Sequence, residues 1–118
     1  MKILIIGASG FLGTKLMSTF SKEYEVIGTY SEHKKEGLFF LDATDKSEVL
    51  KFLLEHKPDV VVDTVALTSS TKCEENPSLA EELNYLTAKN ISEACGNINV
   101  TMIFMSSSYL FDGKNGNY

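Results

Sequence analysis

The sequence has few of the residues that build disulfide scaffolds or metal centres. It contains only two cysteines, Cys73 and Cys95. They are too few for a disulfide framework, and they are not spaced like metal ligands. We therefore expect two reduced thiols in a cytoplasmic protein and predict no metal site.

Long apolar runs and an excess of basic residues are also absent. The apolar runs are too short to cross a bilayer, and the first residues lack the charged-then-apolar layout of a signal peptide. The 11 basic and 16 acidic side chains give a formal net charge of −5. This balance argues against nucleic-acid and membrane partners, although a small anion can still bind at one local site.

What is present is typical of one folded domain. The chain has 118 residues, of which 43% are hydrophobic and 23% are charged. This composition provides enough apolar side chains for a core and does not predict disorder.

Short apolar runs alternate with helical patterns along the whole chain. The patterns predict helices over residues 11–21, 46–56 and 78–95, and strands over residues 2–6, 25–29, 38–41, 60–64 and 100–105. This alternation predicts an α/β fold with a doubly wound, Rossmann-like parallel sheet of strand order 3-2-1-4-5. A ligand is then expected at the carboxyl ends of the first and fourth strands.

Some connections are less regular. Residues 30–36 are too few for a crossover helix, so we expect a loop there. Thr44 is a candidate cap for the helix over residues 46–56, and Asp45 suits a turn or a cap. Residues 65–76 are polar and are expected to form a loop. The fifth strand would lie at a sheet edge, where exposed Ile103 and Met105 could make the chain a homo-oligomer.

Three glycines lie between the first strand and the first helix, in the spacing Gly-x-x-Gly-x-x-Gly. Gly7 allows a sharp turn out of the strand, Gly10 leaves room for a pyrophosphate, and Gly13 allows the helix to pack closely on the sheet. The helix N-terminus adds free N–H groups and the positive end of its dipole. The predicted phosphate-binding residues are Gly7, Ser9, Gly10, Phe11, Leu12 and Gly13.

The end of the second strand bears on the choice of dinucleotide. An acidic residue here favours NAD, but Tyr30 and Ser31 occupy this point, and Glu32 follows. A hydroxyl and the cations in residues 33–35 suit a 2′-phosphate, so the sequence favours NADP over NAD. The alternative is that residues 33–35 form a solvated loop.

Several segments resemble one family. The glycine spacing is similar to that of extended short-chain dehydrogenases/reductases. Residues 58–66, 71–77 and 105–113 and the helix asparagine Asn84 resemble dTDP-4-dehydrorhamnose reductases, in the right order. The methionine adenosyltransferase beta subunit, a regulatory protein, shares this pattern.

The resemblance implies roles for further residues. Asp42, with Ala43 beside it, would contact the adenine, and the segment Val65, Ala66 and Leu67 would contact the cofactor. Ser107 stands in place of the family's active-site threonine, so its hydroxyl would polarise the substrate carbonyl. Ser107 and Ser108 are the predicted substrate-binding residues, with Ser108 in place of the usual aspartate. Asp63 stands where asparagine is usual, and Asn84 is expected to satisfy backbone groups near the fourth and fifth strands.

The implied function is that of an NAD(P)-dependent reductase of a nucleotide-linked 4-keto sugar. Its partners would be a dinucleotide cofactor and a nucleotide-sugar substrate. The family's Tyr-x-x-x-Lys pair is expected beyond residue 118, shortly after a Gly-x-Tyr like residues 116–118. Residues 1–118 are then the N-terminal NAD(P)-binding domain, inactive alone. The alternative is a non-catalytic, dinucleotide-binding regulatory subunit.

Overall fold

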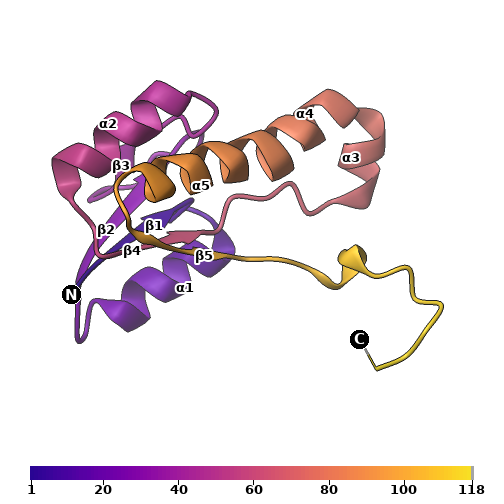
Figure 1. Ribbon diagram of the computed structural model, residues 1–118, viewed down its shortest axis with the longest axis horizontal. Coiled ribbons are helices and arrows are strands. Elements are labelled where there is room, and N and C mark those ends of the chain that lie inside the picture. Colours follow the sequence, from indigo (N-terminus) through magenta and orange to yellow (C-terminus); the bar gives the residue numbers. More distant parts are fainter. Residues whose placement is uncertain (118) are drawn as a thin grey trace.

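The computed structural model describes residues 1–117 as one parallel sheet with helices on both faces (Figure 1). The strands are β1 (Lys2–Ile6), β2 (Glu25–Tyr30), β3 (Phe39–Phe40), β4 (Val60–Asp63) and β5 (Thr101–Phe104). Their order is β3-β2-β1-β4-β5, and every neighbouring pair is parallel. The predicted fold class and strand order are therefore confirmed.

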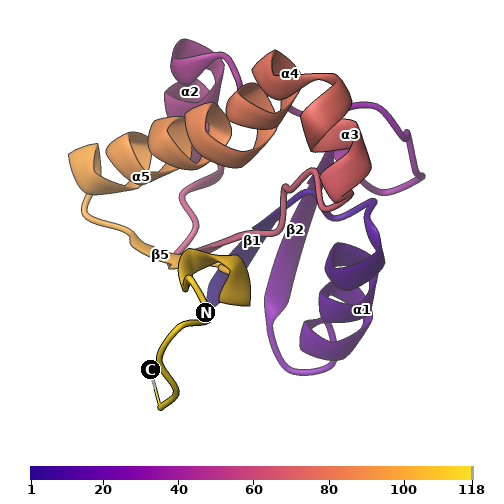
Figure 2. The same ribbon diagram turned by 90° about the vertical axis from the view of Figure 1, so that its right-hand side faces the viewer.

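The helices divide between the two faces of the sheet. Helix α1 (Phe11–Phe20) covers one face, whereas α2 (Lys46–His56) and α5 (Thr87–Asn97) cover the other (Figure 2). Each face of the sheet has its own hydrophobic core, and alternate residues of β1 contribute to the two. Ile3 and Ile5 pack toward α1, whereas Leu4 and Ile6 pack toward α2 and α5. All four side chains are buried, which explains why this strand is continuously apolar.

The connection between β2 and β3 contains no helix, as expected. The two strands are still parallel, with Thr29 opposite Phe39 and Tyr30 opposite Phe40. The loop before β3 is tied to α1, because Lys35 Nζ donates to Thr14 Oγ1 at 2.8 Å.

Two local predictions are wrong. Asp45, not Thr44, caps α2, because its carboxylate accepts from the N–H groups of Ser47 and Glu48 at 2.8 and 3.1 Å. Thr44 instead donates its hydroxyl to Asp42. The polar segment expected to be a loop contains helix α3 (Ser70–Glu75), which is capped by Ser69.

The predicted helix over residues 78–95 is longer than expected and is interrupted. It consists of α4 (Pro77–Glu81), the π-helical turn η1 (Glu82–Leu86) and α5. In the π-helical turn the Thr87 N–H donates to the Glu82 carbonyl, one residue farther back than in an α-helix. The Thr87 hydroxyl donates to the Leu83 carbonyl at 2.7 Å, so this buried polar side chain is satisfied.

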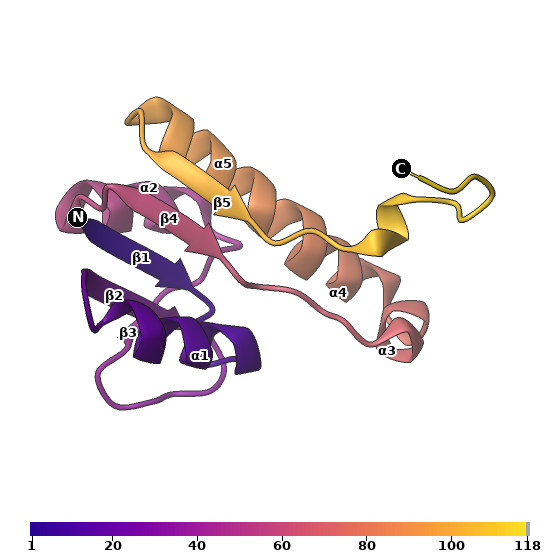
Figure 3. The same cartoon turned by 90° about the horizontal axis from the view of Figure 1, so that it is seen from below.

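The chain leaves the sheet after β5 as an extended arm (Figure 3). The arm contains the 3-10 turn η2 (Ser108–Leu110), and β5 lies at the sheet edge with Ile103 and Met105 exposed. Across residues 1–117, no helix has both the length and the apolarity needed to cross a membrane.

Candidate functional site

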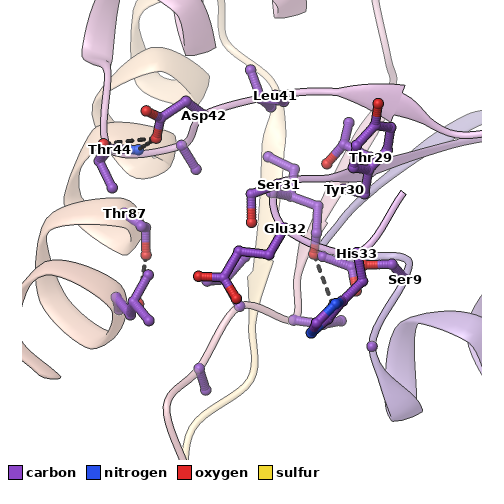
Figure 4. Close-up of a pocket in the computed structure, with 18 of the residues that line it drawn as sticks. Ser9, Thr29, Tyr30, Ser31, Glu32, His33, Leu41, Asp42, Thr44 and Thr87 are labelled. Atoms are coloured by element: carbon purple, nitrogen blue, oxygen red, sulfur yellow. Dashed lines mark hydrogen bonds between the residues drawn. The ribbon is translucent and has the colours of Figure 1, made fainter. Parts of the chain in front are cut away.

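The carboxyl ends of β1 and β4 meet at the point where the strand order reverses. A cleft of about 420 Å³ opens there (Figure 4). Its walls come from the loop after β1, the end of β2, the β3–α2 connection, the segment after β4 and the π-helical turn. This is the edge where a doubly wound sheet binds its ligand.

The loop after β1 and the first turn of α1 each contain a position that only glycine can occupy. Gly7 has a φ of +84°, and a Cβ there would lie 2.8 Å from Thr64 Oγ1. A Cβ on Gly13 would lie 2.6 Å from Ala8 Cα, which is too close for any side chain. Because these two glycines are small, α1 starts directly against the end of β1.

The start of α1 is open to solvent. Gly10 is its N-cap, so no side chain satisfies the first N–H groups of the helix. Gly10 has an ordinary φ of −73°, and its position in the cleft wall leaves the backbone accessible. Phe11, the first residue of α1, is 98% exposed. The loop and helix N-terminus therefore form a cradle that suits a phosphate group.

The far end of the cleft combines aromatic and polar groups. The rings of Tyr30 and Phe40 meet edge to face, with their centroids 5.8 Å apart. Asp42 Oδ1 accepts from the Thr44 N–H at 2.9 Å and from its hydroxyl at 2.7 Å. Figure 4 shows the Glu32 carboxylate pointing into the middle of the cleft, between His33 and Thr87.

The segment after β4 is held at three points. The Thr64 hydroxyl donates to the carbonyls of Ile6 and Gly7 at 2.8 and 3.2 Å. Asp63 Oδ1 accepts from the Val65 N–H at 3.0 Å. The Asn84 side-chain amide binds both backbone groups of Leu67: its oxygen accepts from the Leu67 N–H at 2.7 Å, and its nitrogen donates to the Leu67 carbonyl at 3.1 Å.

Asp63 is the buried ionisable group of this edge. Its side chain is 1% exposed, and Oδ2 has no hydrogen-bond partner among the described residues. Burial raises the pKa of Asp63 from 3.8 to about 6, although the Val65 N–H opposes the shift. On α5, burial and the Asp63 charge raise the pKa of the Cys95 thiol.

A second cleft of about 540 Å³ lies on the other side of the segment after β4. Val65 and Ala66 line both clefts, so this segment is their common wall. The second cleft reaches the end of β5, where Ser107 lies in its lining. Ser107 Oγ also accepts from the Tyr109 N–H at 3.3 Å and caps η2.

Comparison with known proteins identifies the family. Residues 1–118 match the family described as the RmlD substrate binding domain. The chain belongs to this family. The match covers the whole chain, and dTDP-4-dehydrorhamnose reductases and other extended short-chain dehydrogenases/reductases are among its relatives, which confirms the predicted resemblance.

Three curated relatives show the range of the RmlD family. A probable low-salt glycan biosynthesis reductase from Haloferax volcanii is 30% identical over 97% of this chain and 39% of its own length. The dTDP-4-dehydrorhamnose reductase of Streptomyces griseus is 30% identical over 96% and 35%. The methionine adenosyltransferase 2 subunit beta of Xenopus laevis is 27% identical over 99% and 35%. The chain thus spans less than two fifths of these relatives.

Solved structures agree with this assignment. A hypothetical dTDP-4-dehydrorhamnose reductase from Sulfolobus tokodaii has a TM-score of 0.90 at 36% identity, over 100% of this chain and 43% of that one. The Bacillus anthracis reductase in complex with NADP has 0.82 at 25%, over 98% and 39%. The Thermus thermophilus UDP-glucose 4-epimerase in complex with NAD has 0.80 at 28%, over 91% and 38%.

The structure brings most of the predicted cofactor residues of this RmlD-family domain to one place. Those that line the first cleft are Gly7, Ser9, Gly10, Tyr30, Ser31, Asp42, Ala43, Val65 and Ala66. Phe11, Leu12 and Gly13 lie behind the loop in the first turn of α1, and Leu67 lines the second cleft with Ser107. Ser108 lies outside both linings, and Tyr118 lies outside the described residues.

Several lining residues are not among the predicted cofactor-binding residues. Thr64, Phe40 and Glu32 line the first cleft, as do Leu83 and Thr87 from the long helix. Strand pairing is the signal that could have found Thr64, because Asp63 is opposite Ile6 and the next residue must then adjoin Gly7. The expected role of Asn84 in satisfying backbone groups after the fourth strand is confirmed.

Proposed function

We propose that residues 1–118 are the N-terminal cofactor-binding domain of an NAD(P)-dependent, cytoplasmic reductase of a nucleotide-linked 4-keto sugar. The observation that supports the proposal is the glycine loop at the switch point, where α1 begins directly against the end of β1, together with the two clefts on either side of the segment after β4. A dinucleotide is the ligand class that would use the phosphate loop and both clefts.

The residues present fit such a cofactor. The pyrophosphate would sit on the backbone of Gly7 to Gly10, where the N–H groups of the first turn of α1 are free. The adenosine would lie toward Tyr30 and Asp42, which line the far end of the first cleft. The nicotinamide half would lie toward Val65, because this residue joins the first cleft to the second.

The second cleft suits the substrate. When bound, the nicotinamide supplies a hydride to the substrate carbonyl. Ser107 would donate a hydrogen bond to that carbonyl, which makes the carbon more electrophilic. Ser108 lies outside the cleft lining, and this supports Ser107 as the serine that meets the substrate, with Ser108 reaching it only after a rearrangement of the arm.

We propose NADP as the preferred cofactor, with NAD as the alternative. Ser31 and His33 line the cleft beside Ser9 and can bind a 2′-phosphate. Glu32 lines the same wall and favours free ribose hydroxyls, as an acidic residue does in NAD enzymes. Calorimetric titrations with NADPH and NADH decide between them, and clearly tighter binding of NADH refutes the preference.

The variant Gly10→Val tests the proposed function. A Cβ on Gly10 would lie 3.3 Å from the Gly7 carbonyl oxygen, so the loop must shift by only a few tenths of an ångström to accept a side chain. The valine methyl groups would occupy the phosphate path, and NADPH affinity is expected to fall at least tenfold, which is about 1.4 kcal/mol. The matched control is Gly96→Val, because nothing lies within 4 Å of a Cβ on Gly96 in α5. Equal NADPH affinities of the two variants refute the proposal.

A second candidate is a non-catalytic dinucleotide-binding subunit. The observation in its favour is that methionine adenosyltransferase 2 beta subunits match as much of this chain as the reductases do. This candidate also predicts dinucleotide binding, so binding does not separate the two. Reduction of a 4-keto sugar nucleotide by the protein encoded by the complete gene supports the enzyme. Binding to a methionine adenosyltransferase without such reduction supports the subunit.

A further inference from the structure

The last residue of β4 carries a charge that the structure leaves unpaired. Asp63 is 1% exposed, and its Oδ1 accepts one hydrogen bond, from the Val65 N–H. Its Oδ2 is buried and has no partner among residues 1–117. A buried carboxylate normally has several donors or a cation beside it, so this one requires an explanation.

The elements packed around Asp63 supply no positive charge. Its neighbours in the sheet are Ile6 on β1 and Phe104 on β5. On α5 the titratable neighbour is Cys95, a thiol whose own pKa is raised in part by the Asp63 charge. Burial and the Val65 N–H are the influences on the pKa of Asp63, and no cation of the described chain is among them.

The charge lies beside the wall that the two clefts share. Asp63 lines neither cleft, but Val65, which it bonds, lines both. The Asp63 carboxylate therefore acts on a ligand through its field and not through contact. The apolar residues between them screen that field much less than water does.

We infer that Asp63 makes the site prefer the oxidised cofactor, whose nicotinamide ring is cationic, over the reduced cofactor, whose ring is neutral. The inference rests on the proposed function, because it requires a nicotinamide dinucleotide in the clefts. The two cofactor forms are identical outside the nicotinamide ring and differ by its positive charge. A fixed negative charge near the ring therefore favours one form over the other. Asparagine has nearly the same shape as aspartate and no charge, so Asp63→Asn removes the charge and little else.

Coulomb's law sets the scale of such a preference. Two unit charges, even when separated by about 10 Å at an effective dielectric constant of about 20, attract each other enough to change an affinity by roughly tenfold. The preference requires the ionised carboxylate, so it is fully present near pH 8 and weakens toward pH 5.5, because the pKa of Asp63 is about 6.

The test measures the affinities of the oxidised and the reduced cofactor by calorimetry near pH 8, for the wild type, Asp63→Asn and Asp59→Asn. Asp59 lies on the surface at the opposite end of β4, so its variant removes one charge without touching the clefts. We expect the ratio of oxidised to reduced affinity to fall roughly tenfold in Asp63→Asn and to stay unchanged in Asp59→Asn. In the wild type the same ratio should fall when the pH is lowered to about 5.5, without any substitution.

A second readout uses the carboxyl itself. Linkage requires that a cofactor form favoured by the carboxylate lowers the pKa of that carboxyl. The pKa of Asp63, followed by carbon NMR, should therefore be lower in the complex with the oxidised cofactor than in the complex with the reduced one. Equal pKa values in the two complexes, or an affinity ratio that is the same in wild type and Asp63→Asn, overturn the inference while both forms still bind. If neither form binds, the proposed function fails as well.

Discussion

Replacing Asp63 with asparagine should remove a pH-dependent loss of stability that this single buried carboxyl causes. Its pKa is raised from 3.8 to about 6 by burial, and its side chain is 1% exposed. Since the carboxyl is almost fully buried in the folded chain and solvated in the unfolded chain, the whole shift enters the free energy of unfolding.

The sign follows from which state releases the proton first. Well below pH 3.8 the carboxyl is protonated in both states and does not affect the difference between them. As the pH rises, the unfolded chain releases its proton while the folded chain retains it, so the free energy of unfolding falls. The loss is complete only well above pH 6, where the folded carboxyl is also ionised. A shift of this size corresponds to about 3 kcal/mol.

Asparagine introduces an amide in place of Oδ2, and this buried group adds a cost of about 1–3 kcal/mol. That cost does not change with pH, so the comparison uses the change in stability between about pH 4 and about pH 7.5. Over this range the wild type should lose about 2 kcal/mol relative to Asp63→Asn, because a small part of the full loss already occurs below about pH 4, and the carboxyls other than Asp63 titrate in both proteins.

The assay is urea unfolding followed by circular dichroism at a series of pH values. Glu55→Gln is the control, because Glu55 is exposed on α2 and its side chain makes no hydrogen bond or ion pair within residues 1–117. Its pH profile should follow that of the wild type. If wild type and Asp63→Asn lose stability in parallel between about pH 4 and about pH 7.5, the burial argument for Asp63 is refuted.

Two further predictions concern the parts of the fold that build the site, and a third concerns activity. Asp45→Ala should cost about 1 kcal/mol in urea unfolding, because α2 loses its cap, and a larger cost for Thr44→Ala would contradict the assignment of the cap. Gly13→Ala should destabilise the chain by about 1–3 kcal/mol, since its Cβ would overlap Ala8. Gly96→Ala, the same change in open space, should be neutral or slightly stabilising by thermal unfolding, and equal effects would rule out the close approach at Gly13. The 118-residue chain alone should not oxidise NADPH in the presence of a 4-keto sugar nucleotide, and measurable turnover would show that its own residues supply the proton.

The strand order was predictable because each strand is a short apolar run bounded by turn residues. The first five residues after Met1 are the clearest case, since a strand buried on both faces must be apolar throughout. Parallel pairing and right-handed connections then leave few possible orders. The exact caps were not predictable in the same way. Thr44 and Asp45 are both good N-caps, and the choice depends on Asp42, whose carboxylate engages the Thr44 hydroxyl.

The long helix shows a second limit of the sequence. Its apolar spacing predicted helical structure over residues 78–95, but the spacing contains no sign of the π-helical turn at residues 82–86. Tertiary contacts favour this turn: Asn84 bonds both backbone groups of Leu67, while Leu83 and Thr87 line the first cleft. Helix α3 was missed because residues 70–75 are polar and show no periodicity.

The sequence shows that residue 63 is an aspartate, but it does not show whether its carboxyl is buried or solvated. A carboxyl at the end of a strand is solvated or buried according to what covers it, and here it is buried and near Cys95 of α5. The energetic cost of that burial and the proposed preference for a cationic ligand have the same origin, because both measure how poorly the site compensates one negative charge. If the oxidised cofactor supplies the missing positive charge, its binding should also flatten the pH dependence of unfolding. The reduced cofactor, which lacks that charge, should stabilise the chain while leaving the slope with pH unchanged.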